Sequence, residues 1–332
     1  MPSPLAAPTA EARRAPERTA RAGIAALASA LPERRVTSNE IGARLGLEDG
    51  WIASRTGINE RRHAQPEETL AGLAALAGER ALAAADLAAA EIDLILVATS
   101  TPDERVPTAA PLVAAALGAD HAGTIDIGAA CTGFVSALDL AAGAVESQRA
   151  ERVLVIGAEL MSRVLDFDDV RTAGLFGDGA GAAVVVPGGR ATIGAIKLRA
   201  DGANSRLITA SHEEDVVRMD GRATFRNAVA RLSEVTLEVV ADAGIGLEDI
   251  DLFVYHQANG RILAAVGERL GLDTAKVIDS IGHHGNTSAA SIPLALDDAQ
   301  REGRLPDGSK VLLGAFGAGL TWGACVVDWG GS

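Results

Sequence analysis

Cys131 lies in a segment whose residue types suit nucleophilic chemistry. It follows a short predicted strand, Thr124–Ile127, and three small residues, and a helix is predicted to begin directly after it. A thiol at a helix N-terminus faces unpaired N–H groups and the positive end of the dipole, which lower its pKa from about 8.5. The small residues leave room for a substrate, so Cys131 is predicted to be a nucleophile. A buried structural cysteine is the alternative, and it is the interpretation given to Cys325.

Two further side chains stand where catalytic groups gather. His256 follows the predicted strand Leu252–Tyr255, and ligand and catalytic groups collect at such strand ends in α/β folds. Asn286 lies between a turn and a helix start, where an N-cap or Asx turn is the alternative role. An inert exposed imidazole is the alternative for His256. His283 and His284 have no partner at ligand spacing and are predicted to be loop residues.

Two glycine-rich segments begin at Phe176 (FGDGAGAA) and Gly314 (GAFGAGLTWG). A phosphate-binding P-loop requires GK[ST] and a following helix, whereas both segments run into predicted strands. They are predicted to be tight turns that bring backbone N–H groups close to a ligand. Two cysteines cannot form a disulfide framework, and no CxxC or HExxH spacing indicates a metal site.

Composition restricts the class of protein. Of the 332 residues, 48% are apolar, which excludes an intrinsically disordered chain. The formal net charge is −14, which argues against nucleic-acid binding. No run of about 18 apolar residues is present, so no membrane span is predicted. Residues 1–21 are rich in Pro, Ala and Arg and are predicted to form a disordered extension rather than a signal peptide. A cytoplasmic enzyme is expected.

The elements that must position these side chains alternate between apolar strands and Ala-rich amphipathic helices. Such alternation is typical of an α/β protein with buried sheets. The predicted strands are Leu94–Ala98, Val153–Ile156, Ala182–Val186, Leu252–Tyr255, Val311–Leu313 and Ala324–Val327. The predicted helices are Thr69–Ala90, Thr132–Arg149, Arg226–Ala243 and Arg261–Leu270.

An internal repeat with an offset of 158 residues relates the two halves of the chain. The matching segments begin at Glu91 and Asp249, at Ser136 and Leu294, and at Arg152 and Lys310. Matches in one register predict a duplicated α/β unit with halves 22–187 and 188–332. A general likeness among amphipathic α/β units is the alternative explanation.

Taken together, these motifs resemble the β-ketoacyl-acyl-carrier-protein synthase III family of the thiolase superfamily. The resemblance covers residues from about 22 to 330 and implies a thiolase-like, duplicated five-layered αβαβα fold, usually an obligate homodimer. The matching segments are WIASRTGINERR (from Trp51), DIGAACTGF (Asp126), FGDGAGAAVV (Phe176), YHQANGRI (Tyr255), HHGNTSAAS (His283) and AFGAGLTWG (Ala315).

The resemblance implies a catalytic triad of Cys131, His256 and Asn286. It also implies an oxyanion hole made by the N–H groups of Cys131 and Ala318. The implied reaction is decarboxylative Claisen condensation of an acyl-CoA primer with malonyl-acyl carrier protein, which initiates fatty acid or polyketide synthesis. No metal or redox cofactor is implied, and the CoA thioesters are substrates.

The resemblance further implies substrate contacts and a docking site for the carrier protein. Val170 replaces an Arg that contacts CoA in the family, with Arg171 next to it, and Glu268 replaces a common Lys of the docking site. Val106 replaces a Phe that commonly closes the acyl pocket, so primers larger than acetyl are expected. Arg226 and Arg261 are the docking residues. The implied substrate-binding residues are Trp51, Arg55, Val106, Gly221, Phe225, Asn259 and Phe316.

Three other functions compete with condensation. A related acyltransferase would move the acyl group to a small-molecule nucleophile. A non-catalytic dimerisation partner would have lost the nucleophile, whereas this chain retains all three triad residues. A cysteine hydrolase would need a group that positions water, and the sequence indicates none.

Overall fold

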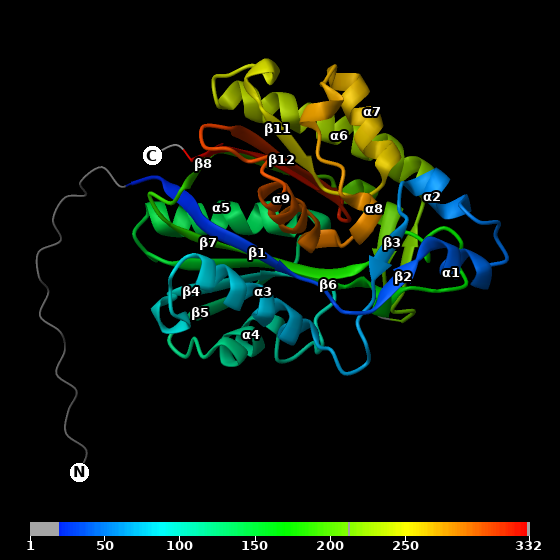
Figure 1. The fold of residues 1–332 in the computed structure, drawn as a ribbon, viewed down its shortest axis with the longest axis horizontal. Coiled ribbons are helices and arrows are strands. Elements are labelled where there is room, and N and C mark those ends of the chain that lie inside the picture. The colour runs from blue at the N-terminus through cyan, green and yellow to red at the C-terminus, as the bar shows by residue number, and fades with distance from the viewer. Residues whose placement is uncertain (1–19, 212, 331–332) are drawn as a thin grey trace, which may run out of the picture.

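Five alternating layers organise the residues that the computed structural model describes, 20–211 and 213–330. Helices form the two outer layers and sheet forms the second and fourth. The helices α5 (Gly133–Glu146) and α9 (Ser291–Arg301) form the middle layer (Figure 1). This confirms the predicted five-layered arrangement. The predicted N-terminal extension, residues 1–21, lies outside the described residues except for its last two positions.

One mixed sheet runs through both halves of the described chain, in the order β11-β12-β13-β8-β1-β7-β6-β4-β5. β1 and β8 meet through only two residue pairs, so the sheet splits into two parts that face each other across the middle helices. The first part contains β1 (Ala22–Ala30), β4 (Leu94–Ala98), β5 (Gly123–Ile127), β6 (Val153–Leu160) and β7 (Asp178–Pro187). The second part contains β8 (Ala191–Ala200), β11 (Leu252–Tyr255), β12 (Lys310–Gly317) and β13 (Thr321–Trp329).

Separate apolar clusters fill the spaces between the layers. α3 (Leu70–Ala84) and α4 (Ala109–Leu117) cover the outer face of the first part of the sheet. α6 (Gly221–Asp242) and α7 (Gly260–Leu270) cover the outer face of the second part. A third cluster surrounds α5 and α9 between the two parts. The remaining elements are α1 (Ser38–Arg44), α2 (Trp51–Thr56), α8 (Ile281–His284) and the strand pairs β2 (Arg35–Thr37) with β3 (Glu60–Arg62) and β9 (Ile208–Ala210) with β10 (Val217–Met219).

The predicted strands are all present, and burial on both faces explains their apolar runs; every residue of β6 is buried. Two predicted helix ends were wrong by five residues or more, and α5 ends at Glu146 instead of Arg149. α3 stops at Ala84 instead of Ala90, because Asp86 adopts a left-handed φ of 55° and a short 3₁₀ turn follows. α6 begins at Gly221 instead of Arg226, because the Asp220 carboxylate accepts a hydrogen bond from the Ala223 N–H and caps the helix.

The repeat predicted from sequence appears as pairs of elements that start 158 residues apart. β4 and β11 form one pair, and α5 and α9 another. The short 3₁₀ turns η2 (Ala130–Thr132) and η7 (Ser288–Ala290) form a third. The duplicated unit is therefore confirmed. Its division into halves 22–187 and 188–332 stays a prediction, because β1 and β8 join both halves in one sheet.

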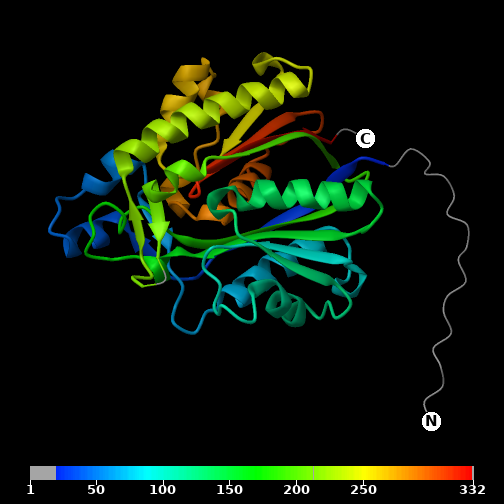
Figure 2. The same cartoon turned by 180° about the vertical axis from the view of Figure 1, so that it is seen from behind.

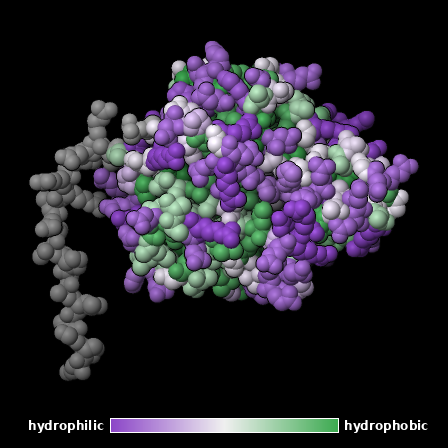
Figure 3. All heavy atoms as spheres, in the orientation of Figure 1, coloured by the Kyte–Doolittle hydropathy of each residue, from purple (hydrophilic) through white to green (hydrophobic). Residues whose placement is uncertain are grey.

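Hydrophilic side chains cover much of the face in Figure 3, with apolar side chains scattered among them. Among the helices described, none has the length and the apolar character that crossing a membrane requires.

Candidate active site

A cavity of about 410 Å³ brings together side chains from distant parts of the sequence. Cys131 comes from η2, just before α5, and His256 follows β11 directly. Asn286 lies in the loop between α8 and η7. The structure therefore places the three predicted triad residues on the wall of one cavity.

Close backbone packing holds the Cys131 turn against the second half of the chain. A Cβ on Gly317 would come within 2.8 Å of the Cys131 nitrogen, so only glycine allows this approach. A Cβ on Gly157 would likewise come within 2.3 Å of the Ala289 carbonyl oxygen in η7. Gly317 therefore sets the distance between β12 and the Cys131 turn. Gly157 sets the distance between β6 and η7.

The environment of Cys131 corrects the prediction of a lowered thiol pKa. Although part of the residue is open to the cavity, desolvation of the sulfur raises its pKa to about 12. The Ser288 side chain acts to lower the pKa, and the negative charge of Glu159 raises it. Burial is the largest influence on the pKa of this thiol.

His256 is buried, and desolvation lowers its pKa to about 3. Its backbone N–H donates to the Gly314 carbonyl at 2.7 Å, which fixes the residue at the strand end. In the described residues its Nδ1 atom has no hydrogen-bond partner. We assign the proton to Nε2, because an N–H at Nδ1 would have no acceptor. His256 is therefore a neutral hydrogen-bond donor at neutral pH.

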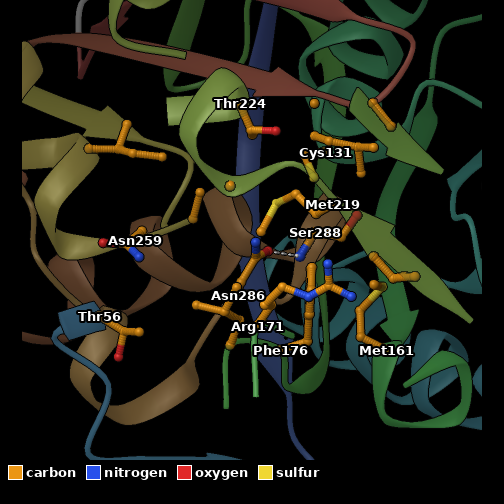
Figure 4. A pocket seen from close by; sticks show the side chains of 18 of the residues that line it. Thr56, Cys131, Met161, Arg171, Phe176, Met219, Thr224, Asn259, Asn286 and Ser288 are labelled. Carbon is orange, nitrogen blue, oxygen red and sulfur yellow. Dashed lines mark hydrogen bonds between the residues drawn. The ribbon is translucent and has the colours of Figure 1, made fainter. Parts of the chain in front are cut away.

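Asn286 is held by hydrogen bonds on both sides of its backbone. Its N–H donates to the Leu175 carbonyl at 2.9 Å, and its own carbonyl accepts from the Gly177 N–H at 3.0 Å. Its side-chain Oδ1 accepts from the Ser288 N–H at 2.9 Å (Figure 4). The Asx turn that the sequence offered as an alternative role is therefore present. Because the turn uses Oδ1, the Nδ2 group stays available to donate a hydrogen bond.

Glu159 is a buried carboxylate that the sequence interpretation missed. It lies on β6 and its Oε1 accepts a hydrogen bond from the Ser288 hydroxyl at 2.8 Å. Desolvation raises the pKa of this carboxyl. An acidic residue in the otherwise apolar run VLVIGAEL was the available signal.

Comparisons with known proteins show the family to which the chain belongs. The model described as 3-oxoacyl-[acyl-carrier-protein (ACP)] synthase III matches residues 125–202, and its C-terminal counterpart matches residues 240–329. The β-ketoacyl-[acyl-carrier-protein] synthase III of Bordetella petrii is 45% identical over 314 residues, 91% of this chain and 96% of the relative. The chain belongs to the 3-oxoacyl-[acyl-carrier-protein] synthase III family.

Solved structures agree with this assignment. The 3-oxoacyl-[acyl-carrier-protein] synthase III of Aquifex aeolicus VF5 superposes with a TM-score of 0.90 at 42% identity, covering 93% of this chain and all of that chain. The priming β-ketosynthase of the R1128 polyketide pathway gives a TM-score of 0.90 at 37% identity, covering 96% and 99%. The predicted family, fold class and acyltransferase class are confirmed.

Most of the substrate contacts that the synthase III family implies line the same cavity. The Arg55 guanidinium lies 4.0 Å from the centre of the Trp51 ring. Val106 is an exception, because it lies outside the lining and is 87% exposed. Arg226 is also outside the lining and exposed. The predicted residues that line the cavity are Trp51, Arg55, Gly221, Phe225, Asn259, Arg261, Phe316 and Ala318.

Val170 and Arg171 both line the cavity. The Arg171 guanidinium makes two hydrogen bonds of 2.8 Å to the Asp169 carboxylate. Its positive charge is therefore already compensated, which distinguishes it from Arg55.

An apolar region of the lining was not predicted from the sequence. Met161, Leu175 and Phe176 contribute from one side, and the β9–β10 hairpin contributes Val217 and Met219 from the other. The hairpin lies in a polar segment without a strand-length apolar run, so the sequence carried no clear signal for it.

The two adjacent histidines differ from their prediction as loop residues. Both belong to the short helix α8, where His283 is exposed. The His284 Nε2 atom lies 2.6 Å from the Asp298 carboxylate. Within the described residues, no group of three or more His, Cys, Asp or Glu side chains is arranged to hold a metal ion.

Proposed function

We propose that this protein condenses an acyl-CoA primer with a malonyl-acyl carrier protein, losing CO2 and passing through an acyl-Cys131 intermediate. The observation that carries the proposal is the convergence of Cys131, a neutral His256 and the Asn286 amide on one cavity. The relatives' printed name, β-ketoacyl-[acyl-carrier-protein] synthase III, supports the same reaction.

In the first half-reaction, the Cys131 sulfur attacks the acyl thioester, and the covalent intermediate divides one difficult step into two. The N–H groups of Cys131 and Ala318 would hold the tetrahedral oxyanion. The close approach of Gly317 to the Cys131 nitrogen supports this pairing, because Ala318 is the next residue. Loss of one such donor typically costs about a hundred- to a thousand-fold in rate.

In the second half-reaction, the malonyl thioester replaces CoA in the cavity. The Nε2–H of His256 and the Nδ2–H of Asn286 donate to its thioester carbonyl. These bonds stabilise the enolate that forms as CO2 leaves, and the carbanion attacks the acyl group on Cys131. Neutral donors suit this step because they lower the enolate energy without transferring a proton. The reaction so written uses no metal or redox cofactor.

The cavity mouth supplies groups that suit CoA and a carrier protein. Arg55 stacked on Trp51 forms a flat cationic surface for an adenine ring and its phosphates. In the described chain, Arg55, Arg226 and Arg261 make no ion pair with a carboxylate, so their charges are available. We assign carrier-protein docking to Arg226 and Arg261, with Glu268 weakening the contact. These substrates would place the reaction in the cytoplasm.

A homodimer is part of the proposal. β5 is an edge strand of the sheet, with one side paired to β4, and its Ile125 is 50% exposed. The neighbouring α5 faces outward with Leu140 52% exposed (Figure 2). An open strand edge beside an exposed leucine on the neighbouring helix suits pairing with a second copy of the chain. In such a dimer the exposed Val106 would reach the partner's cavity.

The test is a reconstituted reaction with acetyl-, isobutyryl-, butyryl- and octanoyl-CoA and malonyl-acyl carrier protein. We expect 3-oxoacyl carrier protein and CO2 with at least one primer. Acylation of the protein without CO2 release would contradict condensation and indicate transfer to a small-molecule nucleophile instead. Analytical ultracentrifugation tests the dimer, and an Ile125→Asp variant that stays dimeric would contradict the proposed interface.

A further inference from the structure

Two threonine hydroxyls join the Cys131 turn to the hairpin turn that contains Ala318. Thr132 follows Cys131 in η2, and Thr321 begins β13 directly after the turn at residues 318–320. The two threonines are 189 positions apart in the sequence, yet their hydroxyl oxygens lie 2.8 Å from each other. The pair therefore connects the two segments whose N–H groups are assigned to the oxyanion hole.

Each hydroxyl also lies close to a backbone carbonyl of its own turn. Thr132 Oγ1 is 2.6 Å from the Ala129 carbonyl oxygen. Thr321 Oγ1 is 3.0 Å from the Ala318 carbonyl oxygen and 3.3 Å from that of Ala129. A distance of 2.8 Å between hydroxyl oxygens indicates that one proton lies between them, so the other proton is donated to a carbonyl. The result is a chain of hydrogen bonds that crosses from one turn to the other.

The Ala318 N–H group is available to bind an oxyanion. Ala318 and Cys131 both line the cavity of the active site. Within the described residues the Ala318 N–H has no hydrogen-bond partner. An oxyanion donor must lie about 2.7–3.1 Å from the position that the oxygen will occupy. The separation of the two turns therefore determines whether both N–H groups reach one oxygen atom.

The packing around the threonine pair leaves an open space. A second cavity, of about 300 Å³, is lined by Ala129, Thr132 and Thr321 together with residues of α5, β8 and β13. Among the described residues it shares no lining residue with the cavity that contains Cys131. Because side chains do not fill this space, close packing cannot fix the turns from this side. The hydroxyl pair is placed to hold them instead.

We propose that Thr132 and Thr321 are positioning residues, which hold the Cys131 and Ala318 N–H groups at the separation that one oxyanion requires. They act through the two turns, and neither threonine lines the cavity where the acyl group is transferred. In the internal repeat, η7 has Ala290 at the position equivalent to Thr132, so this hydroxyl belongs to the turn with the nucleophile. The inference rests on the proposed first half-reaction, in which Cys131 accepts the acyl group.

Replacement of either threonine by valine removes the hydroxyl but keeps a branched side chain of similar size. With the fastest of acetyl-, isobutyryl-, butyryl- and octanoyl-CoA, Thr132→Val and Thr321→Val should each lower the maximal rate of Cys131 acylation about ten-fold. The acyl-CoA concentration that gives half of this rate should not change, because Trp51 and Arg55 are untouched. Intact-protein mass spectrometry of quenched samples measures both quantities.

Iodoacetamide distinguishes misplaced oxyanion donors from a damaged nucleophile. Its reaction with a thiolate displaces iodide at carbon and forms no tetrahedral oxyanion, so both valine variants should be alkylated at the wild-type rate. Thr132→Ser and Thr321→Ser keep the hydroxyl and should restore the wild-type acylation rate. The double valine variant should be no slower than the slower single variant, since both changes break the same link.

Thr236→Val is the matched control, because it removes another buried hydroxyl contact, the 3.0 Å pair of Thr236 and Tyr255. It should lower the melting temperature without changing acylation. Wild-type acylation in either valine variant, losses that multiply in the double variant, or an equal slowing of alkylation would overturn the proposal. Acylation is measured before malonyl thioester is added, so the threonine pair can be confirmed even if CO2 release, and with it the proposed condensation, fails.

Discussion

Two turns at equivalent places in the repeat carry different chemistry. η2 and η7 lie 158 residues apart, and their first residues, Ala130 and Ser288, have nearly the same left-handed φ of 46° and 47°. Each turn leads directly into a middle-layer helix. The first turn carries Cys131, where the second has Ala289.

The strands that pack against these turns also carry different residues at equivalent positions. In the same register, Glu159 of β6 corresponds to Gly317 of β12. Glu159 contacts Ser288 of the second turn, whereas Gly317 packs against Cys131 of the first. The duplicated backbone therefore gives the two turns similar conformations. A few side chains make the first turn nucleophilic and the second a source of hydrogen-bond donors.

The largest expected effect comes from removing the donors of the second half. His256→Ala and Asn286→Ala should still accept an acyl group on Cys131, but CO2 release from malonyl thioester should slow by about 100- to 1,000-fold. The reason is that the enolate loses half of its donors. His283→Ala, at an exposed site in α8, should match wild type. A donor variant that releases CO2 at the wild-type rate would refute its assigned role.

A smaller effect should come from changing the backbone packing of a turn. Gly317→Ala should slow acylation at least about ten-fold and destabilise the fold by about 1–3 kcal/mol, because the new Cβ would collide with the Cys131 nitrogen. Gly128→Ala is the matched control in the segment between β5 and the Cys131 turn, where a Cβ meets open space. Equal acylation rates and melting temperatures for the two variants would contradict this packing argument.

The segments that follow β4 and β11 also differ, because the first is a long loop that contains the exposed Val106 and the second leads quickly into α7. Val106→Phe should shift primer preference toward acetyl-CoA by about ten-fold, since each buried methylene contributes about 0.8 kcal/mol. Acylation rates with acetyl-, isobutyryl-, butyryl- and octanoyl-CoA measure the shift. A strict acetyl preference in wild type that Phe does not change would show that Val106 does not set primer size.

The smallest expected effect concerns stability against pH. Burial lowers the pKa of His256 to about 3 and that of His63 to about 4, so the unfolded chain binds more protons than the native protein in acid. The free energy of unfolding should therefore fall as pH drops from about 6.5 toward 4. In urea unfolding at several pH values, His63→Gln should lessen this fall. A slope identical to wild type would show that His63 titrates normally in the native state.

Helices and strands were predicted from the sequence better than the contacts between distant segments. Strands such as β4 and β11 were recognisable because both faces are buried, and Cys131 stood out at a helix start. The link between Glu159 and Ser288 spans 129 residues, and no local pattern reveals such a partner. The raised thiol pKa was also missed, because desolvation depends on how distant segments pack around the sulfur.

Intact-protein mass spectrometry tests the central claim most directly, with wild type, Cys131→Ser and Cys325→Ser each incubated with the four acyl-CoAs. Cys325 is fully buried in β13, so its replacement controls for loss of a thiol without loss of the nucleophile. We predict a single acyl adduct on wild type and on Cys325→Ser, and none on Cys131→Ser. An adduct that survives on Cys131→Ser, or no adduct on wild type with any acyl-CoA, would contradict an acyl-Cys131 intermediate.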